Sequence, residues 1–270
     1  SGETGDAGAE EKMMMSRNRS EKVKRRFLSL GLAAWTLCVL LGGCGVMKGQ
    51  QEASSASTQE VDSVETLLTI DDPEEKAAVE AAKAKVAAMG EDPRIIATSP
   101  ATADICDRLD LDLAGVCSST ISSLPERYED LTQVGTAMSP DMEIISSLDP
   151  DWILSPVTLQ SDLQPKYEAI DTDWAFLNLR SVPGMYRSIQ ELGEIFQREE
   201  EAQALVDEFT EFYNGYKDQN EGKEAPKVMI LMGLPGSYII ATENSYVGSL
   251  VELAGGENVY AGTDEEFVRV

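Results

Sequence analysis

Short apolar strands alternate with helical segments through the middle of the chain, and this alternation limits the fold more than any other feature. The sequence predicts strands at 94–98, 113–116, 152–155 and 174–177, with helices at 100–109, 139–148 (capped by Ser139-Pro140) and 162–170. Strand–helix units of this kind form a mainly parallel sheet covered by helices. We therefore predict an α/β fold.

One long helical pattern follows this alternation. Apolar residues keep a spacing of three and four from Met185 to Tyr216, which predicts one helix over 182–220, well beyond the ordinary 8–20 residues. The charged run Glu199-Glu200-Glu201 is interpreted as its solvated face. A second strand–helix alternation comes next, with a buried-type strand at 227–232, a strand at 238–241 and a helix at 247–254. The pattern predicts two α/β lobes joined by a single long helix.

The second lobe occupies only Ala225–Val270, which is too short to close a sheet as large as the first. We expect the second lobe to be incomplete and the sequence to be truncated at its C-terminus. The predicted organisation is a signal peptide with an upstream extension at 1–43, a lipid anchor, tether and N-terminal helix at 44–91, a first lobe at 92–181, the helix at 182–220 and the beginning of the second lobe at 221–270.

The N-terminal region has the form of an export signal. Basic residues between Lys22 and Arg26 precede an apolar run, Phe27–Leu41, and the small residues Gly42-Gly43 lead to Cys44. This ending resembles the bacterial lipobox, which implies cleavage before Cys44 and a diacylglycerol on its sulfur. An uncleaved signal-anchor helix is the alternative, although the run is short for a membrane span. Asp72-Pro73 then predicts the start of a helix that ends before Gly90.

Charge and composition exclude several classes of function. The chain has 22 basic and 48 acidic residues, a formal charge of −26, and no histidine. The acidic excess opposes nucleic-acid binding because it repels phosphate. Without histidine the chain lacks the commonest general base and metal ligand, and no Walker loop, G-x-S-x-G elbow or C-x-x-C pair is present. We predict no enzymatic activity; the alternative, a lipoprotein enzyme with Ser237 as nucleophile, has no identifiable base.

Two of the four cysteines lie beyond the signal and anchor region, at Cys106 and Cys117. An exported chain permits a disulfide between them. Their apolar surroundings are equally typical of small buried thiols, so the sequence leaves both states open.

Several motifs between residues 94 and 259 resemble one family. They are Arg94-Ile-Ile-Ala-Thr98, Leu124-Pro125-x-Arg127-Tyr128, Val134-Gly135-x-x-Met138-x-Pro140, Met142-Glu143-x-Ile145, Leu231-Met232-Gly233-x-Pro235-Gly236-Ser237-Tyr238 and Gly255-Gly256-Glu257-Asn258-Val259. Together they are similar to the substrate-binding proteins of iron-type ABC importers, and most closely to haem receptor lipoproteins of the IsdE type. That resemblance implies a receptor, lipid-anchored on the extracellular face of a Gram-positive-type membrane, that captures haem b and delivers it to an ABC permease. Cell-wall haem donor proteins are further candidate partners.

The resemblance also implies particular site residues. Met138 stands where the family has an axial ligand to the haem iron, and the second ligand, a histidine, is expected beyond Val270. Ala101 and Thr102 match contacts at a helix N-terminus, where backbone N–H groups suit a propionate. Thr120 and Ile121 match a contact loop, although they depart from the family's polar-aromatic pair, since Ile121 can pack against porphyrin but cannot form a hydrogen bond.

Bland interpretations remain beside these functional ones. Met138 is one of ten methionines, most of which fill cores in an ordinary protein, and the four contact residues suit ordinary turns and packing. Glu143 matches a carboxylate that docks the permease, and is otherwise a solvated helix residue. A siderophore or corrinoid receptor on the same fold is the alternative function, although the loops show no cluster of arginine or aromatic residues.

Overall fold

The computed structural model describes residues 64–269. The predicted signal peptide, its predicted cleavage site, the predicted lipidation site Cys44 and the predicted tether up to residue 63 all lie outside this range. Within it, no helix combines the length and the apolar character that a membrane crossing requires.

Within residues 64–94, two helices precede the first lobe. The short α2 (Val64–Leu68) was not predicted, whereas α3 (Pro73–Met89) was. The Asp72 carboxylate accepts hydrogen bonds from the amides of Glu74 and Glu75, and Gly90 ends the helix with a left-handed φ of 74°. Both ends of α3 therefore follow from local sequence chemistry.

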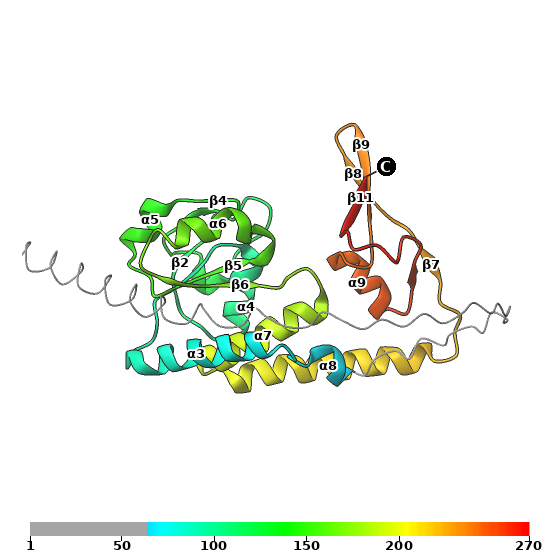
Figure 1. The fold of residues 1–270 in the computed structure, drawn as a ribbon, viewed down its shortest axis with the longest axis horizontal. Helices are drawn as coiled ribbons and strands as arrows, with labels where there is room; N and C mark the ends of the chain where they lie inside the picture. Colours follow the sequence, from blue (N-terminus) through cyan, green and yellow to red (C-terminus); the bar gives the residue numbers. More distant parts are fainter. Residues whose placement is uncertain (1–63, 270) are drawn as a thin grey trace, which may run out of the picture. The chain divides into compact units, whose positions relative to one another are not determined.

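A four-stranded parallel sheet forms the centre of the first lobe, which we define as residues 95–177 (Figure 1). Its order is β2-β1-β5-β6, with bounds Leu113–Val116 for β2, Ile95–Ala97 for β1, Trp152–Pro156 for β5 and Asp173–Leu177 for β6. The helices are α4 (Pro100–Arg108), α5 (Met142–Ser147) and α6 (Gln160–Tyr167), with short 3-10 turns η1 (Glu126–Tyr128) and η2 (Val157–Leu159). The predicted α/β class is confirmed.

The sheet has a separate apolar core on each face. Alternate strand residues point to opposite faces, so Ile95 and Ala97 join one core while Ile96 joins the other. The first core lies between the sheet and helices α3, α4 and α7 (Val182–Phe196). The second contains residues of α5 and α6, such as Ile145 and Leu163. Burial on both faces explains why the central strand β1 is apolar throughout.

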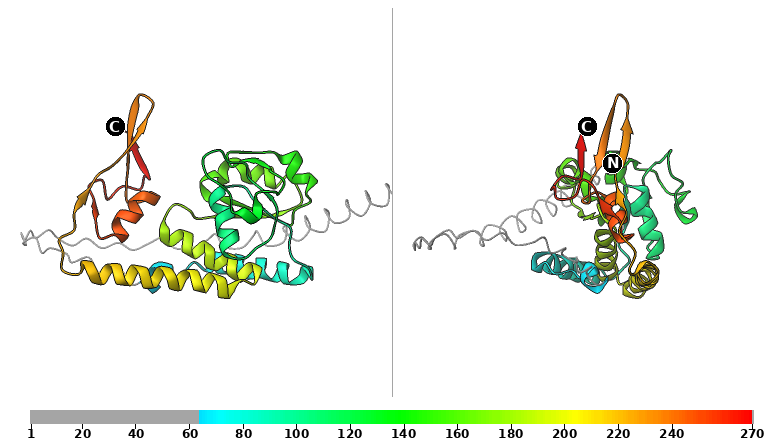
Figure 2. Two further views of the ribbon diagram at one scale, coloured as in Figure 1. Left: turned by 180° about the vertical axis from the view of Figure 1, so that it is seen from behind. Right: turned by 90° about the vertical axis from the view of Figure 1, so that its right-hand side faces the viewer.

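The prediction of one uninterrupted helix over 182–220 is wrong. The chain forms α7 (Val182–Phe196) and α8 (Glu199–Asn220), with Gln197 between them at a left-handed φ of 58° (Figures 1 and 2). The Arg198 N–H donates to the Gly193 carbonyl at 2.7 Å, which closes the end of α7. The break lets α8 pack back on α7, and a Cβ at Gly193 would lie only 2.6 Å from that of Ala202.

The predicted helix at 139–148 begins later than expected. Asp141 is its N-cap and accepts hydrogen bonds from the amides of Glu143 and Ile144. Ser139 and Pro140 instead form β4, which pairs antiparallel with β3 (Gly135–Thr136). The carboxylate of Asp141 displaces the Ser-Pro start because it caps the helix directly.

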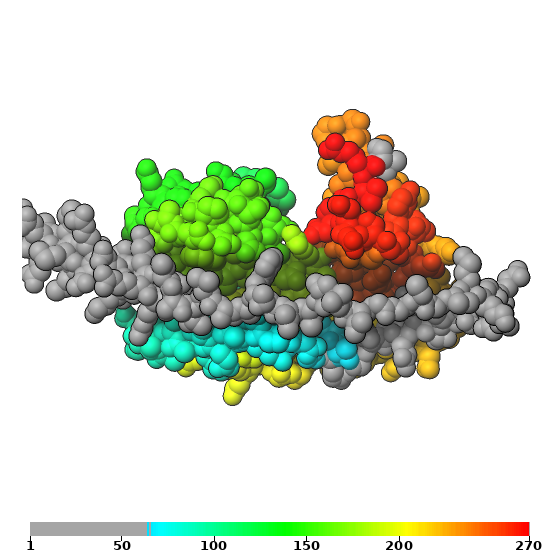
Figure 3. All heavy atoms as spheres, in the orientation of Figure 1, coloured from blue at the N-terminus to red at the C-terminus, as the bar shows by residue number. Residues whose placement is uncertain are grey.

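Residues 225–269 form two small sheets and one helix. Strand β7 (Lys227–Val228) pairs parallel with β10 (Glu257–Asn258), and β9 (Ser237–Ala241) lies between β8 (Ile230–Leu234) and β11 (Phe267–Arg269) in an antiparallel sheet. The helix is α9 (Tyr246–Leu253). The predicted buried-type strand at 227–232 is wrong twice: it divides at Met229, and Leu231 of the edge strand β8 is 55% exposed. In Figure 3 the orange atoms of this hairpin protrude from their neighbours.

The two cysteines within the described residues are free and buried. Cys106 lies on α4 and Cys117 directly follows β2, and both belong to the first apolar core. The structure therefore favours buried thiols over the disulfide that the sequence left open.

Candidate functional site

The candidate site is the edge of the first-lobe sheet at which its parallel strands end. The chain places β2 on one side of β1 and then β5 on the other, so the strand order reverses at β1. Ligands of open α/β sheets bind outside the carboxyl ends of the strands at such a reversal. Thr98 and Ser155, at the ends of β1 and β5, share a buried hydroxyl hydrogen bond of 2.6 Å that fixes this edge.

Helix α4 starts at this edge with one open backbone donor. Its cap residue Ser99 accepts the Thr102 N–H at 3.1 Å, and the Thr102 hydroxyl lies 2.7 Å from the Ser99 hydroxyl. Pro100 has no N–H, so Ala101 carries the remaining amide of the first turn. Ala101 is exposed, whereas Thr102 is fully buried. Of the two predicted contacts, Ala101 is therefore open to a ligand, and Thr102 serves the helix cap.

The loop after β2 carries Thr120 and Ile121. Its start is fixed because the Cys117 N–H donates to the Ala97 carbonyl at 2.9 Å, across to β1. The Ser119 hydroxyl then accepts the amides of Ile121 and Ser122, which turns the chain outward. Thr120 is exposed and Ile121 is 96% exposed. An isoleucine so fully in water offers an apolar contact surface.

Met138 lies in the tight turn between β3 and β4. The segment before β3 runs beside β2: the Val134 N–H donates to Val116, and the Ser118 N–H donates to Gly135 at 2.7 Å. The hairpin therefore leaves the sheet at the same edge as the Thr120 loop. Gly135 is required there, since its φ is 92° and a Cβ would lie 2.8 Å from the Ser139 carbonyl. The Met138 side chain is 79% exposed.

The sheet thus places Ala101, Thr120, Ile121 and Met138 at one edge. No group of histidine, cysteine, aspartate and glutamate within residues 64–269 is suited to hold a metal ion. The exposed thioether of Met138 is a soft, neutral donor, which suits iron in a porphyrin better than a free hard cation. Glu143 is exposed in the first turn of α5, directly after the hairpin.

A cavity of about 430 Å³ adjoins Ala101 and was not foreseen from the sequence. Its lining includes Ile105 of α4, Met185 and Tyr186 of α7, and Tyr246 of α9. The sequence pattern had assigned Met185 to the apolar side of a helix. Only the folded chain shows that residues from four helices, including Leu205 of α8, face one space.

The fold agrees with the comparisons with known proteins. Residues 95–269 match the model of a periplasmic binding protein family. The chain belongs to this family. Its members bind and carry ligands for transport, so the prediction of a binding protein rather than an enzyme is confirmed at the level of the family.

Individual relatives show which binding proteins the chain resembles. The high-affinity heme uptake system protein IsdE of Staphylococcus aureus (strain Newman) is 39% identical over 180 residues, which are 65% of this chain and 60% of that protein. The crystal structure of an ABC transporter substrate-binding protein from Listeria monocytogenes EGD-e matches with a TM-score of 0.64 at 43% identity, over 67% of this chain and 69% of that one. The structure of S. aureus IsdE complexed with heme matches with a TM-score of 0.61 at 37% identity, over 66% and 69%.

Proposed function

We propose that this chain is a receptor that binds haem at the first-lobe edge and delivers it to an ABC permease. The observation that carries the proposal is Met138, a methionine held 79% exposed in a tight turn beside an exposed apolar loop. The 39% identity to a heme uptake protein supports haem rather than another cargo. The family likeness alone does not choose the ligand.

The proposed contacts with haem are of three chemical kinds. The Met138 sulfur binds the iron, Ile121 packs on the porphyrin face, and the open Ala101 N–H receives a propionate. A helix N-terminus favours an anion because its amides and its dipole both point outward. The histidine that the resemblance implies for the other axial position is not among the 270 residues.

Titration with several iron carriers tests the ligand class. We expect the chain to bind haem saturably, one to one, with much weaker binding of a ferric hydroxamate siderophore and of cobalamin. Calorimetry or fluorescence quenching measures all three on the same sample. Saturable binding of siderophore or cobalamin in preference to haem contradicts the proposal and favours the alternative receptor.

We also propose that Cys44 carries a lipid that holds the receptor on the extracellular face of the membrane, and that Glu143 docks the permease. Glu143 suits docking because it is exposed on α5 and near the hairpin without belonging to it. In a reconstituted importer, Glu143→Ala should lower receptor-stimulated ATP hydrolysis while leaving haem affinity unchanged. Glu211→Ala, an exposed carboxylate of α8, is the matched control. Equal stimulation by both variants contradicts docking through Glu143.

A further inference from the structure

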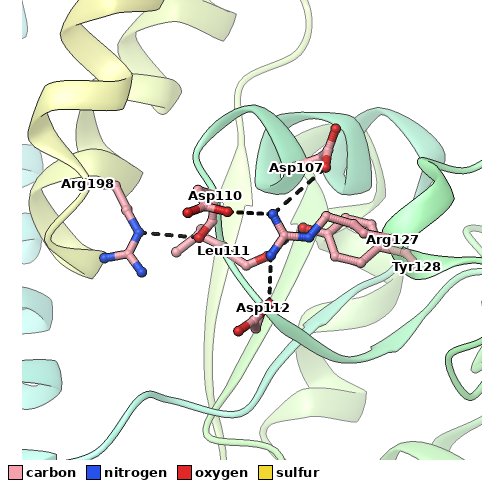
Figure 4. A network of polar contacts seen from close by, with 7 residues as sticks. All are labelled: Asp107, Asp110, Leu111, Asp112, Arg127, Tyr128 and Arg198. Atoms are coloured by element: carbon pink, nitrogen blue, oxygen red, sulfur yellow. Dashed lines mark hydrogen bonds and ion pairs between the residues drawn. The ribbon is translucent and has the colours of Figure 1, made fainter.

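Arg127 is the centre of an ion-pair network next to the Thr120 loop (Figure 4). Its guanidinium donates to Asp110 at 2.7 Å and to Asp112 at 2.6 Å, and lies 3.9 Å from Asp107. The carboxylates come from the end of α4 and from the turn that leads into β2. One cation thus holds three anions from two neighbouring segments.

Asp110 is itself fixed from a second side. Its backbone takes a left-handed φ of 51°, and its carbonyl accepts a hydrogen bond of 3.3 Å from the Arg198 Nε. Arg198 stands at the start of α8, beside the break after Gln197. The partner of Arg127 is therefore anchored to the helix junction as well as to α4.

The residue after Arg127 locks the same turn into the core. Tyr128 is 1% exposed and its hydroxyl donates to the Leu111 carbonyl. The Arg127 guanidinium lies 5.3 Å from the centre of the Tyr128 ring, within the range of a cation–π contact. The turn η1 is thus held by one buried side chain and one ion-pair network.

This turn is the far anchor of the loop that carries Thr120 and Ile121. The near anchor is the hydrogen bonding of Cys117 and Ser118 to β1 and the hairpin. Residues between the anchors are exposed or half-buried, and the Ser119 hydroxyl accepts its hydrogen bonds from amides inside the loop. The position of Ile121 therefore depends on how firmly both anchors are held.

We propose that Arg127 is a positioning residue that fixes the 118–123 loop for ligand contact, through its pairing with Asp110 and Asp112. The ligand part of this inference rests on the proposed function. A single exposed ion pair contributes little to stability. A planar guanidinium that bridges two carboxylates at short distance, however, fixes their relative positions in a way that lysine cannot. Without Arg127, Asp110 and Asp112 lose the guanidinium that bridges them.

Hydrogen exchange of the ligand-free chain tests the positioning directly. In Arg127→Gln, amides of residues 118–123 should exchange about tenfold faster, equivalent to ~1.4 kcal/mol. Arg127→Lys should restore only part of the protection, because lysine replaces the charge but not the fork. Arg108→Gln is the control, since Arg108 forms a surface pair with Glu208 at 3.1 Å outside the network. If Arg127→Gln folds and the amides of residues 118–123 exchange at the wild-type rate, the proposal is overturned. If Arg127→Gln does not fold, wild-type protection of these amides in Arg127→Lys overturns the proposal.

Haem titration of the same variants separates the two proposals. Arg127→Gln should weaken haem binding severalfold, Arg127→Lys less so, and Arg108→Gln not at all. A wild-type chain that binds no haem defeats the proposed function while the exchange result still decides the loop. If the loop of Arg127→Gln exchanges faster but haem affinity stays at the wild-type value, Arg127 has no role in ligand binding. The proposal that the chain binds haem then still stands.

Discussion

At the scale of single residues, the backbone decides which apolar side chains meet water. Met138 is exposed because Gly135 permits a tight turn and the register of the hairpin places residue 138 at its tip. Ile121 is exposed because the Ser119 hydroxyl turns the chain away from the sheet. Cys106 and Cys117 show the opposite outcome, since both lie in the first core.

Burial predicts that these two cysteines are chemically inert in the folded chain. Desolvation raises the pKa of Cys106 to about 12 and that of Cys117 to about 11. The reactive thiolate is therefore scarce at pH 8. After iodoacetamide treatment, mass spectrometry should find both residues unmodified in the native chain and modified in guanidinium. A Cys106–Cys117 disulfide in the native protein contradicts this description.

The sequence could predict Met138 and Ile121 only through the family resemblance, because exposure depends on a turn and a cap. The sequence could not predict the Arg127 network either, because that network also depends on the folded chain. Arg127 is 15 and 17 positions from Asp112 and Asp110, and the fold alone brings them together. The open amide of Ala101, by contrast, follows from the Ser99-Pro100 start of a predicted helix.

At the scale of elements, the junction between α7 and α8 shows how a periodic pattern can mislead. The apolar spacing pauses between Phe196 and Leu205, and Glu199-Glu200-Glu201 fills the gap. Three acidic residues in a first turn favour a new helix start, because they complement the helix dipole. The sequence therefore contained the break, but these glutamates were interpreted as a solvated face.

Gly193→Ala tests the close packing at this junction. The added methyl would lie 2.6 Å from the Ala202 Cβ and 3.0 Å from the Arg198 carbonyl oxygen, so backbone or helix must move. We expect the free energy of unfolding in urea to fall by about 1–3 kcal/mol. Gly215→Ala is the control on α8, where nothing lies within 4 Å, and should raise it by about 0.5–1 kcal/mol. Equal effects of the two changes contradict the close contact.

The packing of α3 on α7 carries a second testable feature. Desolvation raises the pKa of Glu191 to about 8, and a hydrogen bond with Glu75 adds to the rise. Glu194 raises it further, while Arg187 lowers it. Glu191 thus keeps its proton in the folded chain at a pH where the unfolded chain has lost it.

The free energy of unfolding should therefore fall as the pH rises from about 4.5 to about 8, because the folded chain holds one more proton across this window. Glu191→Gln should remove this part of the fall and be more stable than wild type at pH 8, by on the order of 1 kcal/mol. Glu200→Gln, exposed on α8, should leave the fall unchanged. Urea unfolding at pH 5 and pH 8 measures both; identical pH profiles for Glu191→Gln and wild type contradict a protonated Glu191.

At the scale of the whole molecule, the strand–helix alternation was enough to predict the α/β class. It could not predict how residues 225–269 pair, because β7, β10 and β11 have only two or three residues each and pair between segments that are far apart in the sequence. The formal charge of −26 suits a protein that does not bind nucleic acid, and says nothing of its cargo. The proposal of haem as the cargo rests on Met138 at the edge of the first-lobe sheet.

The most direct test of haem binding through Met138 is the spectrum of ferric haem bound to the chain. Ligation by Met138 predicts the near-infrared charge-transfer band of thioether-bound haem, absent in Met138→Ala, whose affinity should fall at least about tenfold. Met229→Ala is the matched control, since Met229 is also exposed but lies between β7 and β8. Met229→Ala should keep the wild-type spectrum. A Met138→Ala chain with the wild-type band and affinity would contradict haem binding through Met138.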